Sequence, residues 1–300
     1  MKNKEFICYL KRKYHYSERT LQEKENQIAN WKKLCIQSQK LEDLRTKEVL
    51  SLVEILRQKY NIQTLNNNIK TLEQYYTYLV EIGKMEENPV KSFRIKTDKK
   101  TLIQGLLTEQ ELRSIYENYS VQGHYGGQFD YYKQRNKVIL GMMVYQGLDS
   151  GTLGILEVQS IDLEKGILKV PKSSEYKLNE RVLILESEQI LEIYRYLTQT
   201  RQELLKLLKV EENTKKLFPK SEKTRISSIT KSIKKELSKN YKLSSLIQLR
   251  YSRISIWKKR YNLRETQYRS GYKSLLSLEK FNQEEIEELQ QSIEKYHPMK

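Results

Sequence analysis

Turn-forming residues are scarce in this chain, and their scarcity most constrains how it folds. Only 4 prolines and 11 glycines occur among the 300 residues. Proteins built from many short strands need these residues at their turns, and collagen-like or linker-like chains need many more. We therefore expect long helices, in a chain with enough length for two domains of about 100–200 residues each.

Apolar periodicity and capping signals give a coarse map of these elements. Helices are expected at residues 18–36, 47–60, 65–82, 135–147, 187–208, 227–240, 244–261 and 263–270, and another begins at the capping box formed by Thr108 and Glu111. Residues 166–170 and 181–185 alternate and predict two strands of a small sheet. The charged residues 96–100 show no apolar period and indicate a domain boundary. The predicted fold class is mainly α with a small antiparallel sheet.

The positive charge is concentrated in one part of the chain. The formal net charge is +17, and residues 215–273 alone hold 18 Lys or Arg and three Glu. So dense a basic block is typical of a protein with a polyanionic partner, and nucleic acid is the leading candidate. An anionic membrane surface is less favoured, because the basic residues occupy several short segments without one continuous apolar face. A solvated basic surface without a partner is the remaining alternative.

Other classes of protein are not favoured. No run of about 18 apolar residues exists to span a membrane, and the N-terminus has no apolar signal region, so we expect a cytoplasmic protein. Cys8 and Cys35 make no disulfide framework and are expected to be buried apolar residues. The three histidines lie far apart, so no metal or cofactor is expected.

Several short motifs occur in a characteristic order. They are LTEQEL at 107–112, YQGLDSGTL at 145–153, IDLEKGILKV at 161–170, Leu249-Arg250, Gly271-Tyr272 and KYHP at 295–298. This order resembles the tyrosine recombinases of the phage-integrase type, and the chain looks like a degenerate Xer-like integrase of a bacterial mobile element. The resemblance implies a helical SAM-like DNA core-binding domain at 1–97, a linker at 98–104, and an α+β catalytic-type domain at 105–300 with a tail helix at 282–296.

The resemblance also implies a chemistry. In that family a tyrosine hydroxyl attacks a DNA phosphate without a metal and forms a phosphotyrosine intermediate. Two arginines and a His or Trp stabilise the charge that develops on the phosphate oxygens, and a lysine on a β-turn protonates the leaving hydroxyl.

Two departures from this pattern bear on catalysis. The first arginine position is Asp149, and the nucleophile position is Phe281. An anion in place of a cation changes the local charge by two units, each worth about 4 kcal/mol at about 4 Å and an effective dielectric near 20. We therefore expect Asp149 to repel a phosphate. Phe281 has no oxygen to attack with, whether or not it also serves as a core aromatic residue.

Some of the remaining family positions keep the family's residue, and others do not. Arg250 keeps the second arginine, as a phosphate clamp or as part of a structural ion pair. The hairpin lysine is assigned to Lys172, or to Lys177 if the alignment shifts within the long turn. The alternative is that Lys172 is only a solvated residue of the hairpin. Ile247 stands where the family has His, and Tyr272 where it has a later His or Trp. In one subset of mobile-element recombinases the first of these is commonly not His, so Ile247 says less about inactivity than Phe281 does.

Candidate DNA contacts follow from the same map. They are Lys172, Arg250, Arg253, Lys258, Lys259, Lys273, Asn66, Asn67 and Lys70. The asparagines are expected at the start of the third helix, where short amides either bind phosphates or cap the helix.

Three functions remain open. The leading hypothesis is a DNA-binding, catalytically inactive accessory subunit in recombination or integration. The alternatives are a sequence-specific transcriptional repressor, and an active recombinase that uses Tyr272, Tyr268 or Tyr251. The expected partners are double-stranded DNA and either an active recombinase paralogue or a second copy bound through the apolar stripe of the tail helix, with no membrane and no cofactor.

Overall fold

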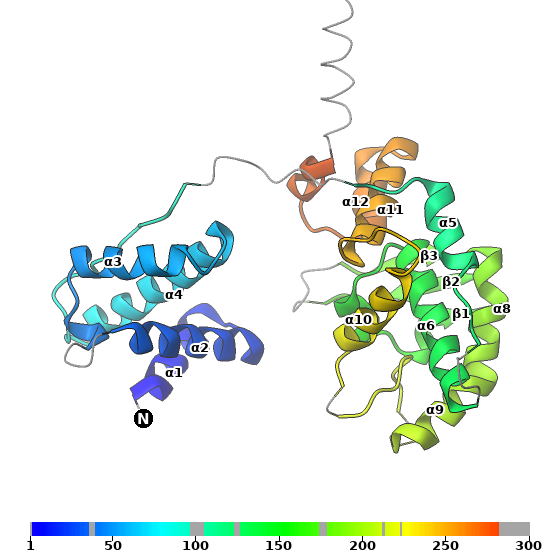
Figure 1. Ribbon diagram of the computed structural model, residues 1–300, viewed down its shortest axis with the longest axis horizontal. Coiled ribbons are helices and arrows are strands. Elements are labelled where there is room, and N and C mark those ends of the chain that lie inside the picture. Colours follow the sequence, from blue (N-terminus) through cyan, green and yellow to red (C-terminus); the bar gives the residue numbers. More distant parts are fainter. Residues whose placement is uncertain are drawn as a thin grey trace, which may run out of the picture. The chain divides into compact units, whose positions relative to one another are not determined.

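The chain forms two compact units, Met1–Lys100 and Thr101–Lys300, each with its own hydrophobic core (Figure 1). The computed structural model describes residues 2–35, 40–96, 105–122, 127–173, 179–211, 214–222 and 224–281. The fold is mainly helical with a small antiparallel sheet, as the sequence predicts. Within the described ranges, no helix combines the length and apolar character that a membrane span requires. The expected linker at 98–104 and the tail helix at 282–296 lie outside these ranges.

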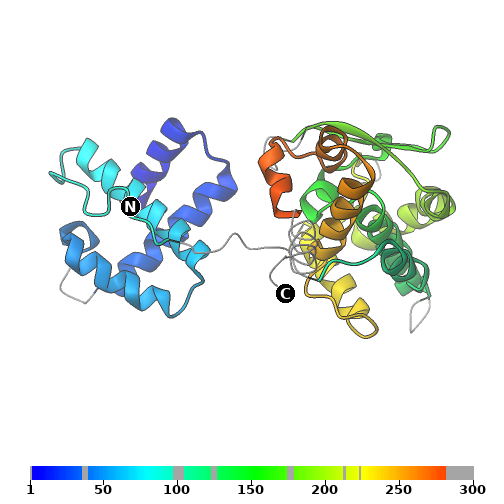
Figure 2. The ribbon, with the colours of Figure 1, turned by 90° about the horizontal axis from the view of Figure 1, so that it is seen from above.

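Four α-helices build the described part of the N-terminal unit (Figure 2). They are α1 (Lys2–Tyr14), α2 (Glu18–Leu34), α3 (Thr46–Arg57) and α4 (Ile62–Glu81), with a short 3-10 turn η1 (Leu41–Asp43) before α3. Helix α4 contacts the other three, because its buried Leu65, Ile69 and Leu72 recur at helical spacing. Phe6 of α1 and Trp31 of α2 are fully buried and complete this core.

The three helices predicted in this unit are confirmed, but α4 begins earlier than expected. Asn61 is its N-cap, since the Asn61 Oδ1 accepts a hydrogen bond of 2.8 Å from the Thr64 N–H. Asn66 and Asn67 therefore lie inside α4 and not at its start, which corrects the sequence expectation. Helix α1 is an addition that the sequence analysis did not predict.

The two cysteines also depart from expectation. Cys8 is exposed and Cys35 is half-buried, and both are free thiols. Helix α1 turns Phe6, Tyr9 and Leu10 toward the core, so Cys8 occupies its opposite face. The prediction that both cysteines are buried is therefore wrong for Cys8.

Lys24 of α2 is a buried cation in this unit, with 8 % of its surface exposed. Its Nζ donates hydrogen bonds to Thr71 Oγ1 at 3.0 Å and to Gln74 Oε1 at 2.7 Å, both on α4. The same Nζ lies 4.9 Å from the centre of the Tyr16 ring. Burial lowers the pKa of Lys24 to about 8, because the charged form loses its hydration. The chain thus supplies its own partners for this ammonium group.

The second unit is larger and holds the sheet. Its helices are α5 (Glu109–Glu117), α6 (Gln128–Val144), α7 (Ser150–Ile155), α8 (Ser187–Arg195), α9 (Arg201–Leu208), α10 (Ile226–Leu237), α11 (Ile247–Arg260) and α12 (Leu263–Ser270). A π-turn, η3 (Tyr196–Thr200), joins α8 to α9 into the long helix that the sequence predicts, and 3-10 turns lie at η2 (Val158–Ser160) and η4 (Leu275–Phe281). Figure 1 shows α6 between α8 and α10, and it contacts both.

Helix α6 is the centre of this unit and is buried along most of its length. Its Lys137 is 7 % exposed, and the Nζ donates hydrogen bonds to the backbone carbonyls of Tyr116, Glu117 and Tyr119. Carbonyls at a helix C-terminus have no partner within the helix. The Lys137 side chain therefore satisfies the end of α5 and fixes α5 against α6.

The sheet has three antiparallel strands in the order β1 (Ile161–Asp162), β2 (Ile167–Val170) and β3 (Arg181–Ile184). Leu168 pairs with Leu183 and Val170 with Arg181, and all four are buried, while the alternate residues are more exposed. The two predicted strands are thus confirmed. Strand β1 was not predicted, since two residues are too few to show an alternation. An important consequence of the register is that Arg181 points inward.

Candidate functional site

Arg250, which the resemblance assigns to the second catalytic arginine, is a buried residue of the second unit. Helix α11 carries it into the interior, where 2 % of the residue is exposed. Its Nη2 donates a hydrogen bond of 2.9 Å to the Ser270 carbonyl, and its Nη1 donates to the Gly147 carbonyl. The guanidinium carbon lies 5.2 Å from the centre of the Tyr272 ring. One side chain thus joins the end of α12 to the loop between α6 and α7.

Asp149, which the resemblance assigns to the first arginine position, has two structural partners. It is the N-cap of α7, since its Oδ1 accepts hydrogen bonds from the Thr152 N–H at 2.8 Å and the Thr152 hydroxyl at 3.1 Å. Its Oδ2 lies 3.8 Å from Arg250 Nε. The carboxylate therefore offsets the charge of Arg250 and begins a helix, which gives it a role in the fold independent of catalysis.

Phe281 ends η4 inside an aromatic cluster. It is 5 % exposed, and its ring meets the Tyr251 ring edge-on at 5.7 Å. The Lys280 ammonium lies 4.4 Å from the centre of the Tyr251 ring, 5.1 Å from that of Tyr272 and 5.3 Å from that of Phe281. Trp257 packs in the same cluster. The residue that the resemblance assigns to the nucleophile position is thus a buried ring without an oxygen.

The three tyrosines considered as relocated nucleophiles lie in different surroundings. Tyr272 packs under Arg250, and Tyr251 packs against Phe281. Tyr268 is 47 % exposed, and its hydroxyl accepts a hydrogen bond of 2.9 Å from the Val182 N–H. Each therefore has packing or hydrogen-bonding partners of its own in the fold.

The last two family positions lie at the ends of elements. Lys172 is exposed just after β2, and Ile247 is 36 % exposed at the first residue of α11. Lys177, the alternative hairpin lysine, is outside the described residues. The structure thus brings Asp149, Arg250 and Tyr272 together. Across the described parts of the chain, no group of three His, Cys, Asp or Glu side chains could hold a metal ion.

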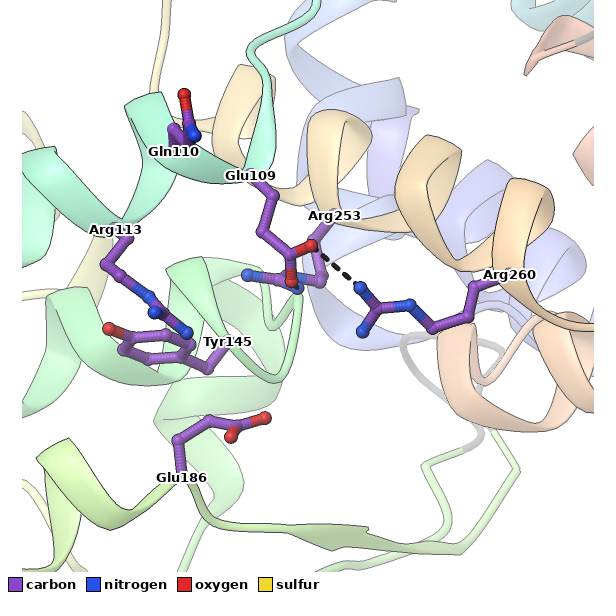
Figure 3. Close-up of a pocket in the computed structure, with 7 residues that line it drawn as sticks. All are labelled: Glu109, Gln110, Arg113, Tyr145, Glu186, Arg253 and Arg260. Atoms are coloured by element: carbon purple, nitrogen blue, oxygen red, sulfur yellow. Dashed lines mark hydrogen bonds and ion pairs between the residues drawn. The ribbon is translucent and has the colours of Figure 1, made fainter.

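A polar pocket of about 330 Å³ lies where α5, α11 and the residue after α6 meet (Figure 3). Glu109 lines it and forms ion pairs with Arg253 Nη1 at 3.2 Å and with Arg260 Nη2 at 2.8 Å. Figure 3 also shows Arg113 beside the ring of Tyr145. The Tyr145 hydroxyl is buried and has no hydrogen-bond partner among the residues described, and burial raises the pKa of Tyr145 to about 12. The ion pairs of Glu109 with Arg253 and Arg260 thus form part of the pocket wall.

Comparison with known proteins identifies the architecture. No family model matches the sequence. "Tyrosine recombinase XerC" of Lactobacillus delbrueckii subsp. bulgaricus is 21 % identical over 208 residues, which are 67 % of this chain and 66 % of that protein. The lambda integrase dimer bound to a COC' core site matches with a TM-score of 0.64 at 15 % identity, over 93 % of this chain and 75 % of that one. The chain has the tyrosine recombinase fold.

Two further structures agree with this result. The Tn1549 transposon integrase in complex with a circular intermediate DNA has a TM-score of 0.64 at 12 % identity, covering 93 % of this chain and 94 % of that one. The XerH recombinase bound to difH substrate has a TM-score of 0.64 at 14 % identity, covering 93 % and 81 %. The resemblance to the tyrosine recombinases is thus confirmed. The XerC alignment spans slightly less than two thirds of that relative's length.

Within the tyrosine recombinase fold, the predicted DNA contacts divide into exposed and buried residues. Lys172, Lys259, Lys273, Asn67 and Lys70 are exposed and Lys258 is half-buried. Arg253 is 4 % exposed, and its Nε donates a hydrogen bond of 2.7 Å to the Val144 carbonyl. Burial lowers the pKa of Arg253, and the Glu109 hydrogen bond acts in the opposite direction. For Arg253 to contact DNA, its guanidinium would have to leave these partners.

Asn66 is also engaged within the recombinase fold. Its Nδ2 donates a hydrogen bond of 2.9 Å to the Ile95 carbonyl, and its Oδ1 accepts one of 3.0 Å from the Ile95 N–H. The side chain thus ties the segment after α4 back onto the helix. Of the two predicted asparagine contacts, Asn67 is the exposed one.

Sequence analysis missed Arg181, a buried residue of the recombinase-type unit. It is 2 % exposed at the first position of β3. Burial lowers its pKa to about 10; the nearby charge of Arg250 acts in the same direction, while Asp149 opposes it. Arg181 thus lies near Arg250 and Asp149. The alternation of residues 181–184 could have identified Arg181, because it places a charged side chain on the inward face of β3.

Proposed function

We propose that this protein binds double-stranded DNA without cleaving it, and acts as an accessory subunit beside an active recombinase in site-specific recombination or integration of a mobile element. The observation that carries the proposal is the aromatic cluster around Phe281. Phosphoryl transfer through a covalent intermediate needs an oxygen nucleophile in line with the phosphate. The ring at this position has no such oxygen and is packed in the interior.

The charge arrangement supports the same proposal. Arg250 gives hydrogen bonds to two backbone carbonyls and lies near Asp149. Catalysis by electrostatic stabilisation needs donors aimed at the phosphate oxygens before the reaction begins. Two of the five Arg250 N–H groups are thus directed at the protein itself, and the position that the resemblance assigns to the first arginine carries a carboxylate.

DNA binding is supported by where the basic residues lie. Helix α10 buries Ile226, Ile229 and Ile233, and its exposed face carries Lys231 and Lys235. This helix belongs to the segment 215–273, which holds 18 Lys or Arg and three Glu. The lambda integrase, Tn1549 integrase and XerH structures are described as complexes with DNA or DNA sites. We expect affinity to fall steeply with salt, because several phosphate contacts release counterions.

The test is covalent trapping on a nicked duplex from the protein's own locus, with and without any recombinase encoded beside its gene, read on a denaturing gel. The expected result is a band shift on a native gel, no adduct on this chain, and an adduct on the partner alone. An adduct on this chain would contradict the proposal and lead to Tyr272, Tyr268 or Tyr251. Binding only at a promoter, with no partner recombinase, would replace it with a repressor function.

The variant Phe281→Tyr sharpens this test. It restores the hydroxyl, while Asp149 and the partners of Arg250 stay as they are. We expect no adduct on the nicked duplex, because position 149 would still carry a carboxylate and Arg250 would still donate to the protein's own carbonyls. Adduct formation by this variant would show that only the nucleophile has been lost.

A further inference from the structure

Arg181 is the most unusual buried group in the second unit. Its Nε and Nη2 are buried and have no hydrogen-bond partner in the described part of the chain. Its one hydrogen bond there is a long one, from Nη1 to the Asn179 carbonyl at 3.4 Å. The N–H groups of Nε and Nη2 point the same way along one edge of the guanidinium. That edge is the one that binds two oxygens of a phosphate or carboxylate side by side.

Other buried arginines of this unit have acceptors from the chain. Arg201 is 6 % exposed, and its Nη2 donates to the carbonyls of Thr214 at 2.6 Å and Lys216 at 2.8 Å. Arg250 donates to two carbonyls as well. Buried polar groups in folded proteins are nearly always paired, and an unpaired buried charge is costly. The open edge of Arg181 therefore marks a place for an acceptor from outside the described residues.

The backbone around Arg181 is shaped to hold it. Gly271 follows α12 with a φ of +75°, and a Cβ on this residue would lie 2.7 Å from Arg181 Cζ. Only a glycine leaves room for the guanidinium against the backbone here. The preceding residue, Ser270, accepts the hydrogen bond from Arg250. Two guanidinium groups thus lie beside consecutive residues at the end of α12.

A hollow of about 630 Å³ borders the Arg181 residue, while the Nε and Nη2 atoms themselves are enclosed. Arg181 lines it together with Lys169 of β2 and Tyr268 of α12, and Glu180 is the acidic residue in its lining. Asp149 is the carboxylate near the two arginines, and it is held as the N-cap of α7. The cations around the hollow outnumber its carboxylates, which favours an anion.

We propose that the open edge of Arg181 binds a phosphate group of the DNA backbone, which approaches from this hollow as the side chains around the guanidinium move aside. The inference rests on the proposed DNA binding for the source of the phosphate, but not for the anion site itself. Phosphate is chosen over a carboxylate because the surrounding segment is suited to a polyanion. The site is centred on Arg181, whose Nε and Nη2 have no partner among the described residues, whereas Arg250 already donates to two carbonyls of the protein.

The first experiment measures the thermal stability of the full chain in inorganic phosphate against chloride at equal ionic strength. The variants are Arg181→Gln and the matched control Arg201→Gln. We expect phosphate to raise the Tm of the wild type and of Arg201→Gln, and not that of Arg181→Gln. Without phosphate, Arg181→Gln should be at least as stable as the wild type, and Arg201→Gln less stable. An equal phosphate response in Arg181→Gln, or a stability loss like that of the control, would overturn the site.

The second experiment measures the affinity for a fluorescent DNA duplex as a function of salt. We expect Arg181→Gln to weaken binding about tenfold and to lower the slope of log affinity against log salt by about one, with Arg201→Gln unchanged. A phosphate response through Arg181 without any DNA binding would keep the anion site, with free phosphate as its source, and would refute the proposed function. Unchanged DNA affinity in Arg181→Gln would refute the DNA phosphate and leave the proposed function standing.

A conservative variant covers the case in which Arg181→Gln does not fold. Arg181→Lys keeps the positive charge and removes the two-donor edge. We expect a folded protein whose Tm no longer responds to phosphate. A full phosphate response in Arg181→Lys would show that charge alone matters and would overturn the paired contact.

Discussion

The two units bury cations in different ways. In the N-terminal unit, Lys24 is surrounded by a hydroxyl, an amide and an aromatic ring from the chain itself. In the second unit, the Nε and Nη2 of Arg181 have no such partners among the described residues. The polar groups around Lys24 give it a structural role, whereas the open edge of Arg181 points to a ligand. Partner groups, more than burial, separate a structural cation from a binding cation.

Substitution of Arg250 should cause the largest loss of stability. Its hydrogen bonds, like those of Lys24, go to groups of the chain itself. The variant Arg250→Met removes the donors to Gly147 and Ser270, and we expect the second unit to lose about 3–5 kcal/mol of unfolding free energy. Urea unfolding followed by Trp257 fluorescence, in a Trp31→Phe background, measures this loss. A loss below about 1 kcal/mol would instead make Arg250 a cation free to bind phosphate.

Gly271 tests how closely Arg181 is held. The variant Gly271→Ala places a Cβ against the guanidinium and strains a backbone with positive φ, and we expect a loss of about 2 kcal/mol. In an Arg181→Gln background only the backbone part remains, so the loss should fall to about 1 kcal/mol. Equal losses in both backgrounds, measured by urea unfolding, would show that Arg181 does not pack on Gly271.

Lys24 makes a prediction about pH. Its pKa is lowered in the folded state, by burial first and then by Lys70, so the unfolded chain keeps this proton to a higher pH. The unfolded state thus binds more protons between pH 8 and 10, and stability rises there with pH, by about 2 kcal/mol. The rise should vanish in Lys24→Met. Urea unfolding followed by Trp31 fluorescence in a Trp257→Phe background gives both curves, and parallel curves would contradict the assignment.

Asp149 should give the smallest change in stability and a gain in binding. Asparagine keeps the N-cap of α7, so Asp149→Asn should alter stability by less than about 1 kcal/mol. Removal of the negative charge near Arg181 and Arg250 should raise DNA affinity by about two- to fivefold at low salt. The control Glu164→Gln makes the same charge change on the exposed β1–β2 turn. An equal gain in both variants, measured by fluorescence anisotropy, would reduce the effect to net charge.

The sequence predicted the elements whose structure depends on residues close to one another in the chain. Periodicity predicted most helices, and the alternation at 166–170 and 181–185 predicted β2 and β3. The site was only partly predictable, because the partners of Arg250 are the backbone carbonyls of Gly147 and Ser270. A backbone carbonyl is present in every residue, so no residue type marks it in the sequence. The same limit hid the closeness of Arg181 to Gly271.

The N-cap formed by Asp149 has a consequence for how this chain can evolve. An arginine at position 149 would remove the acceptor for the Thr152 N–H and the carboxylate near Arg250 in a single step. Such a substitution would therefore weaken the start of α7 whatever it did for binding or catalysis. The N-cap thus makes Asp149 easier to keep than to replace by a cation.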